Sequence, residues 1–346
     1  MTPDQLTPGW LSSVLDIDVS SVASERIGDG LVGLNLRLAL DHDAGDAFPD
    51  SVVVKLPSLD PKSRSTSMVL RTYEREVKFY DVIADTVDIR TPRCHHGSWD
   101  ETTGDFVLVL EDMAPAEQGD QIAGCSIEHA VAAVRELADL HGPRWDDPTL
   151  DEHEFLTRRN GDGAGAELAG LWDMMLPGFL ATYESMLGEQ AVALATAFGS
   201  RLAAWVDGRS GPSAVTHGDY RLDNLMFATQ AGGPAVTAVD WQTPGHGVPI
   251  SDLAYFCGAG LLPEVRRAHE FELVEAYTQR LAVHDVAVDS DWVDEQYRRD
   301  AFSGVIMAVI ASQVVGGTDR SEAMFGAMAT RHLQHALDLE SIDLVD

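Results

Sequence analysis

One short stretch constrains this chain of 346 residues more than any other. Residues 214–227 read A-V-T-H-G-D-Y-R-L-D-N-L-M-F, so a polar loop lies between two apolar segments. A second apolar run, residues 236–239, follows a turn and ends at Asp240. Short apolar runs bounded by turn residues are typical of buried strands. The pattern predicts a hairpin that presents Asp219, Asn224 and Asp240 on one side.

The three polar side chains of this stretch suit one kind of chemistry. A carboxylate such as Asp219 can orient a hydroxyl group and accept its proton. The amide oxygen of Asn224 and the carboxylate of Asp240 are hard ligands that suit Mg²⁺. A metal ion held there would bridge nucleotide phosphates and neutralise charge during phosphoryl transfer. Asp and Asn are also common turn formers, so the loop alone leaves a purely structural role open.

The loop also carries a resemblance to known families. Its spacing matches the protein-kinase motif H-R-D-x-x-x-x-N, which is followed by a magnesium-binding Asp. Gly218 replaces the arginine of that motif, and residues 263–346 lack the A-P-E signal, so a protein kinase is disfavoured. H-G-D-x-x-x-x-N with a later V-D-W-Q resembles instead the aminoglycoside phosphotransferase and choline/ecdysteroid kinase-like families.

A glycine-rich segment near the N-terminus reads G-x-G-x-x-G, with Gly28, Gly30 and Gly33. In a dinucleotide-binding fold such glycines open a helix. Here they precede leucines at 34, 36, 38 and 40, and this alternation predicts a strand. A glycine-rich turn between two strands fits the phosphate flap of a kinase. An ordinary hairpin is the alternative.

Lysine is rare in this chain and occurs only three times, yet Lys55 follows the β-branched run Val52-Val53-Val54. This strand is similar to the V-A-I-K strand of kinases. A compact ammonium group can reach phosphates without the fork geometry of arginine. A lysine that merely extends from the strand end towards water is the alternative.

A helix expected over residues 68–83 offers two carboxylates to this lysine. Its segment Y-E-R-E-V-K-F-Y resembles the F-x-x-E-x-x-F-Y helix of the choline/ecdysteroid kinase-like group, and that match selects Glu76 as the partner of Lys55. Glu74 could instead face solvent and pair with Lys78, four residues further along the helix.

The remaining segments are mainly expected to be helical. A buried strand over residues 106–110 precedes a hinge, and Ser126 caps a helix that ends at His141. His141 is expected to be a packed histidine. The other expected helices cover residues 3–15, 166–187 with an interruption at Pro177-Gly178, 190–206, and a segment from Ile250 with Ser251 as its cap.

Composition excludes some classes of function. A net charge of −32 disfavours binding to nucleic acid or an anionic membrane through a basic surface. The charge is compatible with a cationic substrate, and equally with genome bias or a saline habitat. The start lacks a signal-peptide pattern, no apolar run could span a bilayer, and no protein partner is evident. Three cysteines without metal-like spacing favour a reducing compartment, so we expect a cytoplasmic protein.

We therefore expect an α+β, two-lobed, protein-kinase-like fold. Residues 1–112 would form a small nucleotide-binding lobe with a mixed sheet, and residues 113–346 a larger, mainly helical, catalytic and acceptor-binding lobe. The resemblance implies ATP as donor, Mg²⁺ as cofactor and a hydroxyl group of a small molecule as acceptor. Its implied site consists of Asp219 as catalytic residue, Asn224 and Asp240 as metal ligands, His217 and Asp252 as supports of the catalytic loop, and Gly28, Gly30, Gly33, Lys55, Glu76, Glu111 and Met113 as ATP-binding residues.

The acceptor stays open at this point. An aminoglycoside would use acidic residues, whereas a choline- or sterol-type alcohol would use an aromatic or apolar pocket. A hydroxyacyl-CoA would need arginines near the cleft, for which Arg158-Arg159, Arg266-Arg267 and Arg298-Arg299 are candidates, although solvated surface is the simpler interpretation of these pairs. A non-catalytic nucleotide-binding module is a further alternative.

Overall fold

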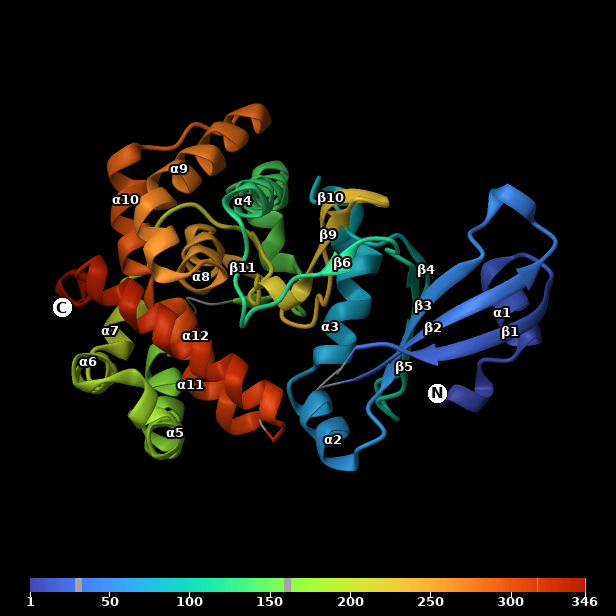
Figure 1. Ribbon diagram of the computed structural model, residues 1–346, viewed down its shortest axis with the longest axis horizontal. Helices are drawn as coiled ribbons and strands as arrows, with labels where there is room; N and C mark the ends of the chain where they lie inside the picture. Colours follow the sequence, from blue (N-terminus) through green and yellow to red (C-terminus); the bar gives the residue numbers. More distant parts are fainter. Residues whose placement is uncertain (29–32, 159–162, 316, 346) are drawn as a thin grey trace.

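The computed structural model describes residues 1–28, 33–158, 163–315 and 317–345. A five-stranded sheet lies at one end, with the N-terminus beside it, and a larger, mainly helical part with the C-terminus lies at the other end (Figure 1). The expected α+β class is confirmed. In spatial order the strands are β1 (Val19–Arg26), β2 (Gly33–His42), β3 (Ser51–Pro57), β5 (Phe106–Glu111) and β4 (Cys94–Trp99).

The alternation of leucines in β2 forms the core of the sheet, as expected. The even-numbered leucines from Leu34 to Leu40 are all buried, and β2 pairs with β1 on one side and β3 on the other. All the described pairings in this sheet are antiparallel, so the expected mixed sheet is wrong. The helical crossover from β3 does lead to a parallel strand, β4. However, β5 lies between the two and runs antiparallel to both.

The crossover consists of two helices where the sequence predicted one. α2 (Pro61–Val69) and α3 (Thr72–Lys78) are separated at Arg71, whose φ of +56° lies in the left-handed region. A left-handed residue interrupts the right-handed hydrogen-bond ladder of a helix. α3 then continues into a π-helical turn, Phe79–Ile83. Similarly, the expected helix over residues 3–15 consists of a 3₁₀ turn followed by α1 (Pro8–Leu15).

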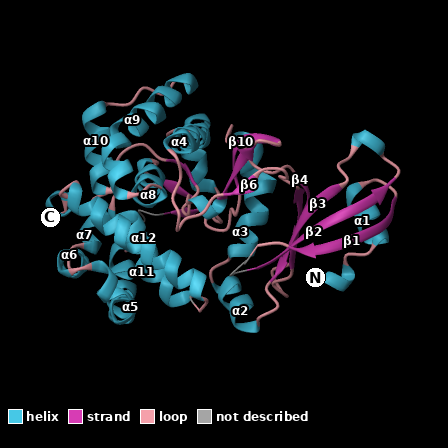
Figure 2. Ribbon diagram, in the orientation of Figure 1, coloured by secondary structure: helices cyan, strands magenta, loops and turns pink. Residues whose placement is uncertain are grey.

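The larger part packs helices around two short sheets (Figures 1 and 2). Among the described residues, no helix combines the length and the apolar composition of a membrane span. The helices are α4 (Ile127–His141), α5 (Ala164–Leu187), α6 (Glu189–Gly199), α7 (Leu202–Asp207), α8 (Ile250–Gly260), α9 (Pro263–Leu281), α10 (Ser290–Arg299), α11 (Phe302–Val314) and α12 (Asp319–Asp338). The short strands are β6 (Glu117–Gln118), β7 (Thr157–Arg158), β8 (Ala214–Thr216), β9 (Leu225–Thr229), β10 (Gly232–Ala238) and β11 (Gly245–Gly247).

Three helix boundaries differ from expectation. α5 continues through Pro177, which is exposed, so water can bond the carbonyl group that a proline leaves without a partner. The expected helix over residues 190–206 divides into α6 and α7 around Ser200. α8 begins at Ile250 rather than after a capping Ser251, because the Ser251 hydroxyl donates backwards to the carbonyl of Val248 at 2.8 Å.

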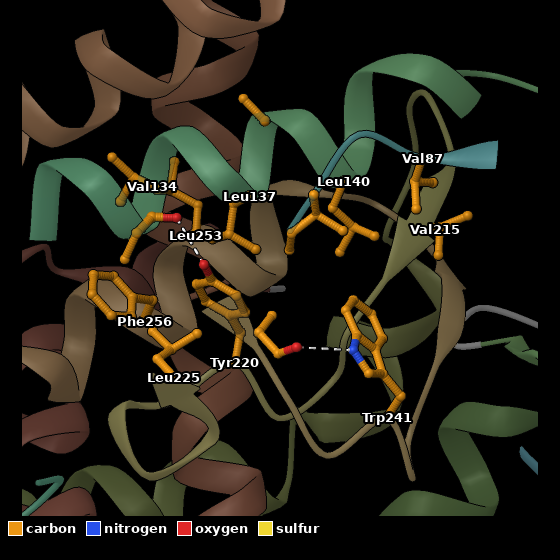
Figure 3. Packing of buried hydrophobic residues seen from close by; sticks show 14 of the residues in the cluster. Val87, Val134, Leu137, Leu140, Val215, Tyr220, Leu225, Trp241, Leu253 and Phe256 are labelled. Atoms are coloured by element: carbon orange, nitrogen blue, oxygen red, sulfur yellow. Dashed lines mark hydrogen bonds between the residues drawn. The ribbon is translucent and has the colours of Figure 1, made fainter. Parts of the chain in front are cut away.

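The cap and the packing of α4 are as expected. Ser126 accepts a hydrogen bond from the backbone N–H of His129, and His141 at the other end is buried, with its Nδ1 2.8 Å from the Tyr277 hydroxyl. β9 and β10 pair antiparallel, which confirms the expected hairpin, and α4 packs against β10 and β8. Val134, Leu137 and Leu140 of α4 lie in one buried cluster with Tyr220 and Trp241 (Figure 3). Tyr220 reaches across this core and donates its hydroxyl to the carbonyl of Ala133 at 2.9 Å (Figure 3).

Buried aromatic residues connect the sheet end to this hairpin. The ring of Trp241 stacks on Phe79 at a centroid distance of 3.7 Å, and both side chains are fully buried. Fully burying an aromatic side chain of this size contributes roughly 1.5–3 kcal/mol. Since Phe79 follows α3 and Trp241 follows Asp240, the stack fixes α3 relative to the end of the hairpin. The predicted lobe boundary at residues 112–113 falls just after β5 and stays a prediction.

Candidate active site

The H-G-D loop follows β8 and is held from behind by α8. The Asp252 carboxylate in the first turn of α8 accepts the backbone N–H groups of His217 at 2.6 Å and Gly218 at 3.1 Å. Gly218 has a φ of +80°, a conformation that a side chain would strain. The loop conformation therefore depends both on a glycine at this position and on the Asp252 carboxylate.

His217 adds a second brace inside the loop. Its Nε2 donates to the carbonyl of Val239 at 3.1 Å, and its Nδ1 accepts the backbone N–H of Asp219 at 3.3 Å. Burial lowers the pKa of this imidazole, against the opposing effect of Asp252. A neutral ring with its proton on Nε2 can make both bonds at once. His217 thus joins the loop to the chain just before Asp240.

The Asp219 carboxylate lies at the centre of the site. It receives the Nε–H of Arg221 at 3.1 Å on each oxygen, the Tyr255 hydroxyl at 2.6 Å on Oδ1, and the Asn224 amide at 3.0 Å on Oδ2. About one fifth of the Asp219 side chain is exposed. The carboxylate is thus oriented by three groups but still accessible from outside.

A buried ion-pair cluster forms next to this loop. The Lys55 ammonium, on β3, binds Glu76 on α3 and also lies 2.7 Å from Asp240 Oδ1. Burial would lower the pKa of Lys55, but the Asp240 and Glu76 carboxylates outweigh it and raise the pKa. Burial likewise opposes the charge on Asp240, but Lys55 keeps its pKa below the ordinary value. The pairing of Lys55 with Glu76 rather than Glu74 is as expected, since Glu74 binds Arg71.

The two expected metal ligands lie at neighbouring positions. The backbone N–H of Val239 donates to the carbonyl of Asn224 at 2.9 Å, which places Asp240 one residue away from that contact. The Asn224 amide nitrogen faces Asp219, so its amide oxygen is left for another ligand. Asp240 has a φ of +68°, which is strained for a non-glycine residue and is common at functional sites.

The side chains of Asn224 and Asp240 are suited to hold a magnesium ion that is also bound to a nucleotide. Mg²⁺ is commonly bound through one or two protein ligands together with substrate phosphates and water. Asn224 and Asp240 would supply two such oxygens. Across the described ranges, no group of three or more His, Cys, Asp or Glu side chains forms a self-sufficient metal site.

The remaining expected ATP-binding residues lie around the sheet. Gly28, two residues after the end of β1, has a φ of +65°. A Cβ on Gly33 would come within 3.1 Å of the Leu56 carbonyl oxygen. Gly30 lies outside the described residues. At the end of β5 the Glu111 carboxylate pairs with Arg90, and Met113 is buried. A role of this backbone segment in binding adenine stays a prediction.

Two functional candidates were missed by the sequence reasoning: Arg221 and Tyr255. Arg221 bridges the Asp219 carboxylate and, through Nη1 at 2.7 Å, the Asp223 carboxylate. Its place within the motif, two residues after Asp219, was a signal that could have been used. Tyr255 is three residues after Asp252, and residues at this spacing share one face of a helix.

The comparison with known families bears directly on this arrangement. A profile of the phosphotransferase enzyme family matches residues 50–285, more than half of the chain, and this span includes Lys55, Glu76, Asp219 and Asp240. The chain belongs to the phosphotransferase enzyme family. The family resemblance inferred from the motifs is thereby confirmed.

Solved structures similar to this phosphotransferase agree in fold. A protein from Ralstonia eutropha described as an aminoglycoside phosphotransferase has a TM-score of 0.57 at 17% identity, over 96% of this chain and 97% of that one. The GDP complex of aminoglycoside 2'-phosphotransferase-IIIa has a TM-score of 0.55 at 13% identity, over 93% and 95%. Plasmodium vivax ethanolamine kinase has a TM-score of 0.51 at 12% identity, over 90% and 82%. At such identities the likeness concerns the fold alone.

A curated relative matches over a shorter span. Acyl-CoA dehydrogenase family member 10 of Mus musculus is 36% identical to this phosphotransferase over 66 residues. The match covers 18% of this chain and 6% of the mouse protein, so the two share only a small segment of the relative's length.

Next to the H-G-D loop, the phosphotransferase has a cavity of about 410 Å³. Gly218 and Tyr255 form the wall nearest Asp219. The rest of the lining is mostly apolar and comes from α5, α7 and α11, chiefly Leu168, Leu171, Trp205, Ile306, Met307 and Ile310. Among the described lining residues the charged ones are Glu167, Arg209 and Asp252; Arg209 is paired with Asp300, and Asp252 braces the loop.

The arginine pairs proposed for a coenzyme A ligand have other partners. Arg266 and Arg267 both bind Asp338, and Arg266 is almost fully buried. Arg298 and Arg299 donate to backbone carbonyls of the C-terminal segment. The interpretation as solvated surface is wrong for Arg266, which is buried, whereas Arg267 is exposed as expected, and Arg298 and Arg299 are half-buried. The guanidinium groups of both pairs join α9 and α10 to the C-terminal segment. The side chain of Arg158 and all of Arg159 lie outside the described residues.

Proposed function

We propose that this phosphotransferase transfers the γ-phosphate of ATP, with Mg²⁺, to a hydroxyl group of a small molecule. The observation that carries the proposal is the position of Asp219. Its carboxylate contacts Asn224, next to the Lys55–Asp240 ion pair, and also contacts Tyr255, which lines the cavity. A phosphate donor and a hydroxyl acceptor could therefore meet at this carboxylate.

On the donor side, Lys55 would bind the phosphates while Glu76 holds its ammonium in place. The glycines Gly28, Gly30 and Gly33 would let the backbone approach the phosphates, and the backbone at Glu111–Met113 would bind adenine. Mg²⁺ held by Asn224 and Asp240 would neutralise negative charge on the phosphates. Phosphoryl transfer is catalysed mainly by positioning the phosphates and stabilising their negative charge. A cluster that fixes an ammonium group between two carboxylates is therefore suited to this side.

On the acceptor side, Asp219 would orient the hydroxyl group. The acceptor oxygen forms a bond to the γ-phosphorus, the bond from that phosphorus to the β,γ-bridging oxygen breaks, and ADP leaves. The hydroxyl proton passes to Asp219 and then to water. An ordinary Asp, with a pKa near ~4, is too weak a base to ionise an alcohol beforehand. Its contribution would be positioning and late acceptance of the proton.

The cavity favours an acceptor with an apolar body over an aminosugar. An aminoglycoside carries several ammonium groups, and each needs a carboxylate or water when it is bound. The cavity lining offers aliphatic and aromatic side chains, and Glu167 is its one described carboxylate that is not already engaged with the loop. An alcohol whose hydroxyl is attached to an aliphatic or ring system is therefore the second, more specific candidate. A cytoplasmic location and the absence of a nucleic-acid partner stay predictions.

A phosphotransfer assay with labelled ATP tests the proposal. The purified protein is incubated with Mg-ATP and, separately, kanamycin, choline, cyclohexanol and a hydroxyacyl-CoA. We expect transfer to one of the alcohols with an apolar body, and loss of transfer with EDTA or in Asp240→Ala. Nucleotide binding that is indifferent to both EDTA and Asp240→Ala would contradict the metal assignment. Absence of transfer and of ATP hydrolysis would contradict the function.

A further inference from the structure

The Asp219 carboxylate is already surrounded by the protein's own donors. Oδ1 accepts the Tyr255 hydroxyl and the Arg221 Nε–H, and Oδ2 accepts the same Nε–H and the Asn224 amide. An ionised carboxylate offers about four lone-pair positions. These four contacts fill them. An acceptor hydroxyl can hydrogen-bond to Asp219 only if it replaces one of the three groups.

The three groups are not equally placed to be replaced. Arg221 also binds the Asp223 carboxylate, and the Asn224 amide also donates to the Asp219 carbonyl at 2.9 Å. Neither of these two is among the described residues that line the cavity. Tyr255 does line it, and Asp219 is the one partner to which its hydroxyl donates among the described residues. An acceptor that enters from the cavity therefore meets the Tyr255 hydroxyl first.

The Tyr255 ring is fixed from behind. It stacks on the buried His332 ring, with a centroid distance of 5.3 Å and an interplanar angle of 22°. Space for His332 exists because Gly258 and Gly304 lack a Cβ, which would come within 2.5 Å and 2.0 Å of the imidazole. Burial, and then the Asp219 carboxylate, raise the pKa of the Tyr255 phenol, so the hydroxyl stays protonated and remains a donor.

We propose that Tyr255 is a positioning residue whose hydroxyl holds, in the absence of acceptor, the place on Asp219 Oδ1 that the acceptor hydroxyl takes. The inference rests on the proposed function, since it needs Asp219 to orient the acceptor. The Tyr255 hydroxyl excludes water from this place and so limits transfer of phosphate to water. An acceptor must make enough contacts with the apolar walls to displace it, which discriminates against small hydroxyl compounds.

Tyr255→Phe tests this, because it removes the hydroxyl and leaves the ring against His332. We measure phosphate release from Mg-ATP in water without acceptor, and kcat and KM with cyclohexanol. Phosphate release is expected to rise about 2- to 10-fold and KM to fall by a similar factor, the worth of one hydrogen bond. The kcat is expected to stay within about threefold of wild type, since Asp219 keeps Arg221 and Asn224.

Tyr297→Phe is the matched control. Tyr297 is also a buried tyrosine whose hydroxyl points at a carboxylate, Glu270 Oε2 at 3.5 Å, but it lies on α10 and does not line the cavity. It should leave phosphate release and KM unchanged. If it moves them as much as Tyr255→Phe, the effect is a general loss of packing and the inference is overturned.

The outcomes separate this inference from the proposed function. A wild-type protein that neither transfers phosphate nor hydrolyses ATP, or an Asp219→Asn variant as active as wild type, overturns both. If wild type is active and Asp219→Asn is not, an unchanged KM and unchanged phosphate release in Tyr255→Phe overturn the role of Tyr255 alone. A kcat more than tenfold lower at unchanged KM would do the same, because the hydroxyl would then be needed in the transition state.

Discussion

The two sides of Asp219 consist of different kinds of side chains. On the proposed donor side Lys55, Glu76 and Asp240 form a cluster of charges that are largely buried and paired. On the proposed acceptor side, aliphatic and aromatic residues of α5, α7 and α11 enclose a cavity with few charges. Binding of phosphate requires specific charged groups at fixed spacing. A hydrocarbon surface can be recognised by many combinations of residues, so only the donor side leaves a motif in the sequence.

The same contrast predicts how each side tolerates change. Removing one partner of a buried ion pair leaves an uncompensated charge, which typically costs about 3–5 kcal/mol. Apolar substitutions that conserve volume usually cost less than about 1.5 kcal/mol. We therefore expect even conservative changes to be damaging on the donor side. On the acceptor side, changes of polarity should matter more than changes of shape.

The largest effect is expected at the carboxylate that both sides share. Asp219→Asn keeps the shape but removes the proton acceptor and the charge that orients the hydroxyl. Phosphotransfer should fall by roughly 10²- to 10⁴-fold, while the dissociation constant for Mg-ATP should stay near that of wild type. Both quantities can be measured on the same preparation by a labelled-ATP assay and by calorimetry. Turnover at the wild-type rate would remove Asp219 from the catalytic role.

The next largest effect tests the donor side. Lys55→Arg should lose nearly as much kcat/KM for ATP as Lys55→Ala, about 30- to 1,000-fold, which corresponds to ~2–4 kcal/mol of transition-state stabilisation. A guanidinium group is longer and planar, and the space between Glu76 and Asp240 accommodates an ammonium. Melting temperatures serve as the folding control. A folded Lys55→Arg protein within a few-fold of wild type would mean that Lys55 does not bind phosphate and only forms the buried ion pair with Glu76 and Asp240.

The sequence predicted the fold around Lys55 and the pairing of its ammonium well, and the cavity hardly at all. Periodicity and motif spacing sufficed for β2, β3, α4 and the pairing of Lys55 with Glu76, because local pattern and phosphate chemistry determine them. The left-handed Arg71 and the continuous α5 escaped, since both depend on tertiary context rather than propensity. The cavity residues are an ordinary apolar stripe in the sequence. Only their convergence on Gly218 and Tyr255 distinguishes them from core.

A smaller effect is expected from a change of polarity in the cavity wall. Met307→Glu places a carboxylate among aliphatic neighbours on α11. If the acceptor has an apolar body, its KM should rise by about 5- to 150-fold, since an unsatisfied polar group costs roughly 1–3 kcal/mol. The affinity for Mg-ATP should not change. Met307→Leu is the volume-matched control and should behave as wild type. A variant Met307→Glu that accepts kanamycin better than wild type would instead favour a cationic acceptor.

The smallest effect concerns the free energy of unfolding and depends on buried histidines. His217, His332 and His335 are all fully buried, and burial lowers the pKa of each. Both ring nitrogens of His332 lack a hydrogen-bond partner among the described residues. Below pH 6.5, the ordinary pKa of histidine being about 6.5, these side chains bind protons in the unfolded chain but stay unprotonated in the folded protein. The stabilising contribution of these neutral histidines is therefore complete above about pH 6.5 and is lost as the pH falls below it.

The expected loss of stability at low pH can be tested without any substrate. The free energy of unfolding, measured by denaturant titration between pH 7 and pH 5, should fall with pH by up to about 1.4 kcal/mol per pH unit for each such histidine. His332→Phe keeps an aromatic ring against Tyr255 and breaks no hydrogen bond, but it removes one titrating group. The variant should therefore lose stability less steeply than wild type. His129→Gln, a change at an exposed position of α4, should keep the wild-type slope. If His332→Phe and wild type decline in parallel, the imidazole of His332 takes up its proton in the folded protein as easily as in the unfolded chain, and burial does not keep the ring behind Tyr255 neutral.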